Sequence, residues 1–269
     1  MIQVSYLPLF FRQASIFILA LGFLSIAGFG VNQAGAQSTA PAQELVVEAS
    51  TSLEWDQTEG IYRAIGDAKA QQGSQTIQAD ELTASYDPDA DGGDITKIIG
   101  KNNVRFVDGS QKGQGSYLVY DQISQTYLLD GPAAQVAGPD GTASALTRIF
   151  YDKPAAKITL TDDAEIILTD GRELAANLIY VLLDENQNVS KIEARGDVKV
   201  TQPNGQTANS DNADYDKIGN TALFTGNVII TEKDSVLTGD RAEIDFNTGI
   251  SRMLSSSSGQ RIKGRFTTR

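Results

Sequence analysis

Apolar and polar residues alternate with a period of two along much of the chain. The alternation is clear in the runs at 82–86, 179–183 and 242–246. Successive side chains of a strand point to opposite faces, so these runs predict strands that bury one face. Turn residues separate the runs, as in Pro-Asp-Gly at 139–141 and Pro-Asn-Gly at 203–205. No run after residue 36 has the periodicity of an amphipathic helix, so the pattern predicts an all-β protein.

Seven of the alternating runs end in an apolar or aromatic residue followed by Asp. The seven pairs lie at intervals of 31, 34, 31, 32, 32 and 29 residues. They are Trp55-Asp56, Tyr86-Asp87, Tyr120-Asp121, Tyr151-Asp152, Leu183-Asp184, Tyr215-Asp216 and Ile244-Asp245. Such regular spacing indicates a tandem array with a period of roughly 30 residues. We expect the aromatic residues to point inward and each Asp to accept backbone N–H bonds in the next turn.

A Gly or an Asp follows each of the first six pairs after 10 to 13 residues. These residues are Gly66, Gly100, Gly131, Asp162, Gly196 and Gly226. We interpret each as a bend within a strand, because Gly and Asp tolerate the backbone conformations of tight bends. Short strands that bury one face only by stacking on their neighbours predict an elongated, open β-jelly roll built from tandem repeats of roughly 30 residues, with a β-solenoid as the alternative.

The first 36 residues have a different pattern. Arg12 precedes an apolar run at 14–30, and Ala34-Gly35-Ala36 follows it. This order predicts a secretory signal peptide cleaved after Ala36, and export to a bacterial periplasm. The run is short of the ~20 residues that span a bilayer, but a retained membrane anchor is the alternative.

The predicted organisation therefore has four parts. A signal peptide at 1–36 precedes a linker at 37–46, a jelly roll at 47–254 and a flexible basic tail at 255–269. The tail contains Arg261, Lys263, Arg265 and Arg269 and no acidic residue. A disordered tail is the simpler interpretation, and an electrostatic handle for phosphorylated lipid head groups or an acidic partner is the alternative.

Net charge limits the classes of ligand. Without Arg12, the 22 Lys and Arg residues fall to 21 against 34 Asp and Glu, a formal charge of −13. This charge argues against a nucleic-acid partner. It also requires that an anionic ligand be held mainly by apolar contacts. The chain has no Cys, so its stability cannot come from disulfides.

The absence of both His and Cys removes Ser-His-Asp triads, thiol nucleophiles and the usual zinc sites. Asp162, Asp163 and Glu165 are the remaining catalytic candidates, since paired carboxylates cleave glycosidic bonds. However, Asp162 and Asp163 occupy a position where other repeats place a bend. We therefore expect a structural role for them, no enzymatic activity and no cofactor.

Residues 87–94, DPDADGGD, match the start of a calcium-binding loop. Asp87, Asp89 and Asp91 stand at ligand positions, but Ile98 stands where the bidentate Glu belongs. The segment is therefore a weak calcium candidate, and an acidic hairpin insertion is the simpler interpretation.

The repeated unit, an alternating run followed by Tyr-Asp, a turn and a small-Gly-polar-Val motif, carries a family resemblance. Examples of the motif are ARGDV at 194–198 and FTGNV at 224–228. Over residues 47–250 the chain resembles the LptA/OstA-like family of periplasmic lipopolysaccharide transport proteins. The resemblance implies an open jelly roll that polymerises end to end and carries lipopolysaccharide in an apolar groove from the inner to the outer membrane. The first repeat, at 54–70, is less apolar than the later ones.

The partners implied by the resemblance are lipopolysaccharide or its lipid A, the inner-membrane and outer-membrane Lpt components of similar fold, and further copies of the chain. We expect the last strand, at 236–246, to pair with an N-terminal strand near 45–55 of another copy, because no Pro blunts its edge. A secreted β-solenoid that binds or hydrolyses polysaccharide is the alternative function.

Inward-facing apolar residues are the candidate lipid contacts. They are Tyr86, Phe106, Tyr120, Tyr151, Val181, Tyr215, Val228, Ile230 and Phe246. These residues equally suit a dry core, and both roles can hold if central residues pack together while those at an open seam touch lipid.

Overall fold

The computed structural model describes residues 45–87, 95–245, 247–248, 250–255 and 262–266. These residues form 18 strands and no helix. The strands are β1 (Leu45–Glu48), β2 (Ser52–Asp56), β3 (Ile61–Gln72), β4 (Gln75–Tyr86), β5 (Ile95–Asp108), β6 (Gln111–Asp121), β7 (Thr126–Asp130), β8 (Ala134–Gly138), β9 (Gly141–Ala145), β10 (Arg148–Asp152), β11 (Lys157–Leu168), β12 (Glu173–Leu183), β13 (Val189–Thr201), β14 (Thr207–Asp216), β15 (Thr221–Glu232), β16 (Ser235–Asp245), β17 (Ile250–Leu254) and β18 (Lys263–Arg265). Within the described ranges no helix has the length and apolarity to cross a membrane.

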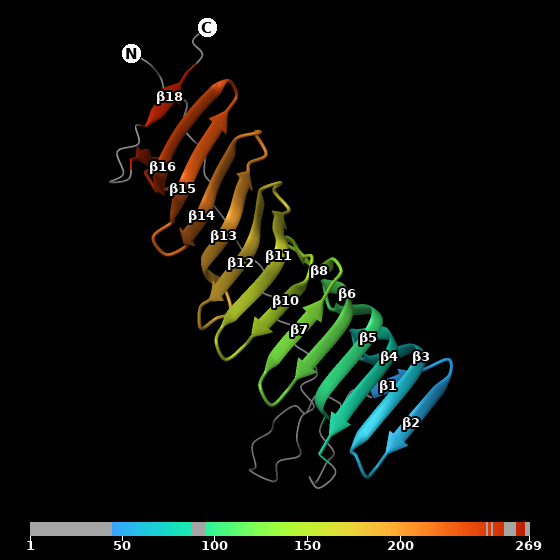
Figure 1. Ribbon diagram of the computed structural model, residues 1–269. Helices are drawn as coiled ribbons and strands as arrows, with labels where there is room; N and C mark the ends of the chain where they lie inside the picture. Colours follow the sequence, from blue (N-terminus) through green and yellow to red (C-terminus); the bar gives the residue numbers. More distant parts are fainter. Residues whose placement is uncertain (1–44, 88–94, 246, 249, 256–261, 267–269) are drawn as a thin grey trace.

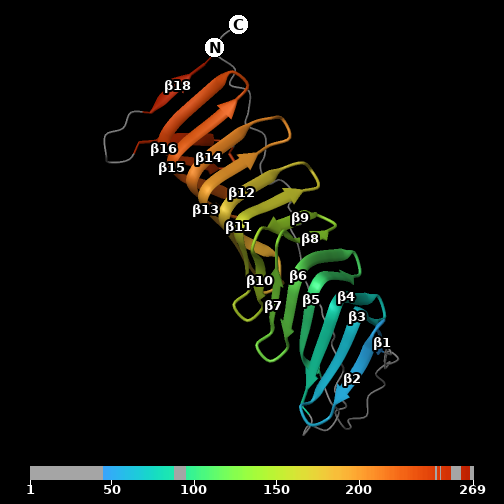
Figure 2. The same ribbon diagram turned by 45° about the vertical axis from the view of Figure 1, so that its right-hand side comes forward.

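The strands follow one another along a single elongated, twisted body (Figure 1). Each long strand pairs with the strands before and after it in the chain, and every pairing is antiparallel. The view turned by 45° shows the same progression from β1 and β2 at one end to β18 at the other (Figure 2). The prediction of an all-β, elongated jelly roll is therefore confirmed.

Most long strands bend near their middle. At Gly226-Asn227 both residues have a positive φ, 78° and 50°, and the pairing of β15 with β16 shifts register between Thr225 and Val228. Gly66-Asp67, Asp162-Asp163 and Gly196-Asp197 share this backbone conformation. Such bulges bend a strand, as the sequence predicted. In β5, however, the bend lies at Asn102-Asn103 and not at Gly100, because only the two asparagines adopt positive φ.

The bends divide the body into two half-sheets. Half-sheet I extends from β2 to β17, and half-sheet II extends from β1 to β18; β3 and β16 each belong to both. In the middle of the body separate strands replace a bent one. Gly131-Pro132, joined by a cis peptide bond, separates β7 in half-sheet I from β8 in half-sheet II.

The two half-sheets face each other and bury their inner side chains in one core. Ile158, Leu160 and Ile179 are among the least exposed large side chains, at 2% or less. Alanines such as Ala68 and Ala164 come directly after the bends and are fully buried. Val198 and Val228 are buried at the same position, so the residue after each of these bends belongs to the core. With no disulfide, this burial, at ~1.5–3 kcal/mol for a large apolar side chain, is the main source of stability.

The recurrent Asp residues stabilise the turns as predicted. The Asp216 carboxylate accepts the backbone N–H groups of Ile218 and Gly219 at 2.8 and 3.1 Å. Equivalent bonds to following backbone N–H groups are made by Asp56, Asp121, Asp152, Asp184 and Asp245. The repeat in the sequence is therefore a repeat of one turn.

The prediction that 236–246 forms the last strand is wrong. β17 pairs with Arg241–Asp245 and β18 pairs with Val236–Thr238, so both halves of β16 are covered. The alternation in the sequence ends before these short strands, which explains the error. Part of the predicted tail, Lys263–Arg265, thus extends half-sheet II.

Candidate lipid-binding cavity

The N-terminal end of the body contains an apolar cavity of about 470 Å³. Its lining comes from β1 to β5, and most of it is apolar or aromatic. The lining residues are Leu45, Val47, Leu53, Glu54, Trp55, Tyr62, Arg63, Ala64, Ala70, Gln72, Gln75, Thr76, Ile77, Leu82, Thr83, Ala84, Ile95 and Ile98.

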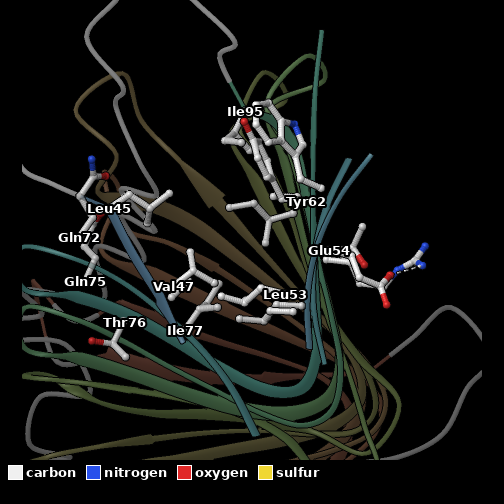
Figure 3. A pocket seen from close by; sticks show the side chains of 18 residues that line it. Leu45, Val47, Leu53, Glu54, Tyr62, Gln72, Gln75, Thr76, Ile77 and Ile95 are labelled. Carbon is white, nitrogen blue, oxygen red and sulfur yellow. Dashed lines mark hydrogen bonds and ion pairs between the residues drawn. The ribbon is translucent and has the colours of Figure 1, made fainter. Parts of the chain in front are cut away.

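The cavity lies between the two half-sheets. Leu45 and Val47 of β1 point inward from one wall, and Leu53 of β2 points inward from the other (Figure 3). Glu54 turns to the outside, where its carboxylate lies 3.4 Å from the Arg63 guanidinium. The charged side chains at the rim therefore pair on the outer face, and the inner surface stays apolar.

Aromatic side chains form one wall near the mouth. The rings of Trp55 and Tyr62 stack with centroids 5.6 Å apart, and those of Tyr62 and Tyr86 lie 4.9 Å apart. The Trp55 indole N–H donates a hydrogen bond to the Tyr86 hydroxyl at 2.8 Å. This bond leaves the polar atoms of both rings satisfied, so their faces present an apolar surface.

The cavity is open because no further described strand covers β1 and β2. Leu53 and Trp55 are 60% and 59% exposed, unlike their counterparts farther along the same inner face. A contiguous exposed apolar surface of this kind marks a site for an apolar ligand or partner.

Most residues predicted as lipid contacts are buried in the core. Phe106, Tyr120, Tyr151, Val181, Tyr215, Val228 and Ile230 are all less than 8% exposed. Tyr86 is half-buried and joins the aromatic wall of the cavity. Phe246 lies outside the described residues. The structure therefore places Tyr86 beside the cavity and the seven buried residues farther along the inner faces.

The tyrosines of the core form a second aromatic stack. Tyr127 lies between Tyr120 and Tyr151, with centroid distances of 4.7 and 5.7 Å. Burial raises the pKa of Tyr127 and Tyr151, and it raises the pKa of Tyr215 to about 12. These side chains are therefore neutral at physiological pH and add no charge to the apolar interior.

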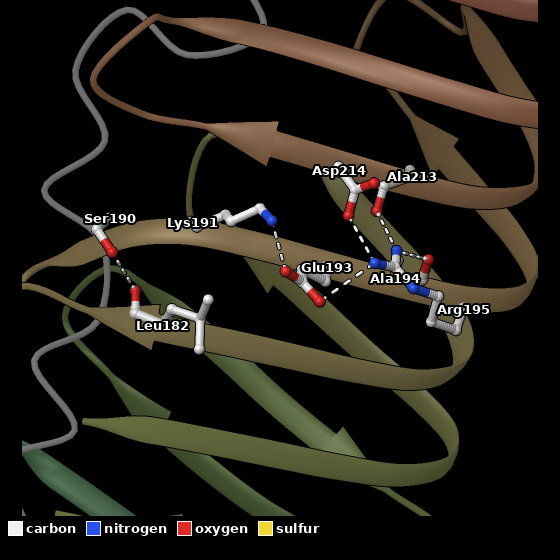
Figure 4. Close-up of polar contacts among 8 residues, drawn as sticks. All are labelled: Leu182, Ser190, Lys191, Glu193, Ala194, Arg195, Ala213 and Asp214. Carbon is white, nitrogen blue, oxygen red and sulfur yellow. Dashed lines mark hydrogen bonds and ion pairs between the residues drawn. The ribbon is translucent and has the colours of Figure 1, made fainter. Parts of the chain in front are cut away.

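The outer face carries charged side chains in cross-strand pairs. Lys191, Glu193, Arg195 and Asp214 form a chain of ion pairs across β13 and β14, including an Arg195–Asp214 contact of 2.7 Å (Figure 4). The hydrogen bond from Lys191 lowers the pKa of Glu193. A polar hollow beside this chain reaches Arg241 and Arg252, and the described residues that line it include no aromatic side chain on which a sugar could stack.

The carboxylate candidates have structural positions. Asp162 and Asp163 form the bend of β11, and the Thr147 hydroxyl donates a hydrogen bond to Asp162 at 2.6 Å. The described residues contain no cluster of three or more potential metal ligands. Asp87 lies at the end of β4, whereas Asp89 and Asp91 lie outside the described residues, so calcium binding stays a prediction.

The sequence interpretation missed the residues that open the cavity. We expected a linker up to residue 46, a less apolar repeat at 54–70 and a strand near 45–55 that pairs with another copy, but no cavity lined by Leu45, Val47, Leu53 and Trp55. Residues 45–48, LVVE, do not alternate between apolar and polar, so the sequence did not indicate which of these side chains face inward.

Comparison with known proteins adds a family. The family described as LptA/(LptD N-terminal domain) LPS transport protein matches residues 47–145, 150–250 and 207–264. No curated protein matches the chain. Among solved structures, the chain is similar to LptH, the LptA homologous periplasmic component of the lipopolysaccharide transport device of Pseudomonas aeruginosa. The identity is 13%, the match covers 84% of this chain and 96% of that one, and the TM-score is 0.22.

Proposed function

Since the chain belongs to the LptA/(LptD N-terminal domain) family of LPS transport proteins, we propose that it binds lipopolysaccharide by the acyl chains of lipid A. In this proposal it passes the lipid between the inner-membrane and outer-membrane parts of the transport machinery. The observation that carries the proposal is the open apolar cavity between β1, β2 and the strands that follow.

The chemistry of the cavity suits acyl chains better than a head group. Both walls present aliphatic and aromatic side chains, and the nearby Glu54 and Arg63 pair on the outside. Each methylene removed from water contributes ~0.8 kcal/mol, so about ten methylenes contribute ~8 kcal/mol before losses. This free energy corresponds to micromolar binding.

Charge favours the same mode. The formal charge of −13 that remains without Arg12 repels the anionic head group, so attraction has to come from the apolar part of the lipid. Binding by acyl chains leaves the phosphates and sugars at the mouth of the cavity, in water.

The buried inner residues extend this proposal along the body. Lipid that enters beside Tyr86 would advance over Phe106, Tyr120, Tyr151, Val181, Tyr215, Val228, Ile230 and Phe246 where the two half-sheets separate. While the half-sheets remain closed, the core contains Phe106, Tyr120, Tyr151, Val181, Tyr215, Val228 and Ile230. Lipid transfer of this kind needs no catalytic residue, and we propose that the protein is not an enzyme.

The proposed setting is the periplasm. The signal peptide at 1–36 would direct export, with cleavage after Ala36. Head-to-tail contact with other copies, and with Lpt components of similar fold, would then extend the body into a bridge between the membranes. The calcium candidate and the polysaccharide-binding alternative contribute nothing to this role.

Two neighbouring valines provide a matched test. Val47 lines the cavity, whereas Val46 precedes it on the opposite face of β1 and is 46% exposed. Val47→Asp should weaken binding of lipid A at least tenfold in a titration followed by native mass spectrometry, while Val46→Asp should leave it nearly unchanged. Equal effects of the two substitutions, or none, would contradict the proposal.

A further inference from the structure

The two ends of the body carry opposite charges. Residues 45–62, which include β1 and β2, contain Glu48, Glu54, Asp56 and Glu59 and no basic residue. The described residues after Asp245, which include β17 and β18, contain Arg252, Lys263 and Arg265 and no acidic residue. All the charged residues of these four strands are exposed. The basic charge of the C-terminal end is a local feature, because the protein as a whole is strongly acidic.

The strand directions at the two ends are compatible in both half-sheets at once. In half-sheet I, β17 runs toward the bend and β2 runs away from it. In half-sheet II, β18 runs away from the bend and β1 runs toward it. The C-terminal end of one copy therefore meets the N-terminal end of another with both new pairings antiparallel, as in the rest of the body.

The register aligns specific charges across this contact in half-sheet I. The Cα pairing leads from Glu54 through Arg63 and on, strand by strand, to Glu243 and Arg252 without a break. Glu54 and Arg252 thus lie in the same transverse row, on the outer face. If a second copy continues the row, Arg252 of one copy lies directly opposite Glu54 of the next.

The same alignment holds in half-sheet II. There the pairing leads from Glu48 through Lys69 to Thr238 and Lys263. Continuing this row places Lys263 opposite Glu48 of the next copy. Opposite charges that face each other across antiparallel strands stabilise the pairing, and like charges in that position destabilise it.

We infer that these charges code the order of assembly, with the C-terminal end of one copy docking on the N-terminal end of a second copy through Arg252–Glu54 and Lys263–Glu48 pairs. Contact between two N-terminal ends, or between two C-terminal ends, places like charges together. With the bends aligned, such a contact also makes the new strand pairs parallel instead of antiparallel, so it is disfavoured. The contact is heterologous and adds copies in an open series. This inference rests on the head-to-tail association of the proposed function and adds its register and its charge pairs.

Charge reversal at one end tests the pairs. Arg252→Glu with Lys263→Glu places acidic residues at the paired positions of both ends, and Glu48→Lys with Glu54→Lys places basic residues at the paired positions of both ends. Both double variants are expressed from the full-length sequence and purified. In sedimentation velocity at low salt, each should self-associate at least tenfold more weakly than the unsubstituted protein. Raising the salt should weaken association of the unsubstituted protein, because the charges are exposed.

An equimolar mixture of the two variants is the decisive sample. In the mixture every head-to-tail contact between unlike variants again joins opposite charges, so association should return. Lys153→Glu with Lys199→Glu is the matched control for the Arg252→Glu, Lys263→Glu variant. It changes the net charge by the same amount, at exposed sites away from both ends. The control should associate like the unsubstituted protein.

Three results would overturn the inference: an unsubstituted protein that stays monomeric, a mixture that does not associate, or a control that loses as much association as the end variants. Lipid A binding, measured separately by native mass spectrometry on the same variants, reports on the proposed function. The Arg252→Glu, Lys263→Glu variant should retain this binding, because neither residue lines the cavity.

Discussion

The Trp55 indole N–H donates to the Tyr86 hydroxyl across 2.8 Å, although the two residues are 31 positions apart in the chain. They occupy equivalent positions in consecutive repeats, since each is followed by the recurrent Asp. The hydrogen bond therefore joins the first repeat to the second at the mouth of the cavity. It also places the one tryptophan of the chain where a bound acyl chain would lie.

Trp55 should report on ligand binding. Trp55 is 59% exposed, so acyl chains that cover it should shift its fluorescence emission to shorter wavelength. Lipid with brominated acyl chains should quench the emission by contact. Tyr86→Phe removes the hydrogen-bond acceptor and should lower the free energy of unfolding by about 1 kcal/mol while preserving the spectral shift. Unchanged emission at saturating lipid would show that the ligand binds elsewhere.

The bend of β15 should require Gly226. Its φ is +78°, and a Cβ added there would lie 2.2 Å from Oδ2 of Asp211. Gly226→Ala should lower the free energy of unfolding by at least about 2 kcal/mol, since the left-handed conformation alone costs roughly 1–2 kcal/mol for an L residue. Urea denaturation measures this difference.

Gly205→Ala is the control for that substitution. Gly205 has a φ of +84°, but nothing lies within 4 Å of an added Cβ. It should therefore show the conformational cost without the steric one. Equal losses at the two positions would mean that the contact with Asp211 is unimportant for the bend.

The turn aspartates should make the protein sensitive to acid. The Ser124 backbone N–H is the largest cause that lowers the pKa of Asp121, and the Thr248 N–H lowers that of Asp245. A carboxyl group whose pKa is lower in the folded state stabilises the protein above its unfolded pKa, about 3.9. That stabilisation disappears as the pH falls through the folded pKa. Stability should thus be constant near neutral pH and decrease below about pH 4.

Asp121→Asn tests the contribution of one turn. The amide oxygen of Asn still accepts the Ser124 N–H, but the side chain no longer titrates. The variant should lose less stability than the unsubstituted protein between pH 5 and pH 3 in urea denaturation. Identical pH profiles would assign the acid sensitivity to other groups, such as Asp170 and Glu193, whose pKa values are also lowered.

The sequence predicted the repeat and most of the bends because both depend on local chemistry. A turn Asp bonds N–H groups two to four residues away, and the bend at Gly226-Asn227 needs only residues that tolerate positive φ. The misplaced bend in β5 has the same origin, since Asn102-Asn103 meets the requirement and Gly100 merely resembled the motif.

The cavity and the ends of the body depended on long-range pairing and were not predictable in that way. Leu53 lines the cavity, and is not part of the core, because no described strand pairs with β2 on the side away from β3. The sequence around Leu53 does not reveal how many strands follow at that edge. Similarly, β17 and β18 are short and fully or mostly exposed, and only their pairing with β16 makes them strands.

The core should tolerate little loss of volume. Ile179 is fully buried in β12, between β11 and β13. Ile179→Ala should lower the free energy of unfolding by about 2–5 kcal/mol through lost burial and a residual cavity. Val46→Ala, at an exposed position of β1, should change it by less than about 0.5 kcal/mol, as is usual for surface substitutions. Comparable losses at the two sites would contradict the assignment of the inner faces as the core.

The most direct test of the account is photo-crosslinking of lipopolysaccharide in living cells from adjacent positions of β1. A photoreactive amino acid at Val47 points into the cavity, and one at Val46 points away from it. We predict that lipopolysaccharide crosslinks at Val47 and not at Val46, and that the adduct at Val47 contains acyl chains. Equal crosslinking at both positions, or crosslinking only at Val46, would contradict the proposal that the cavity holds the lipid.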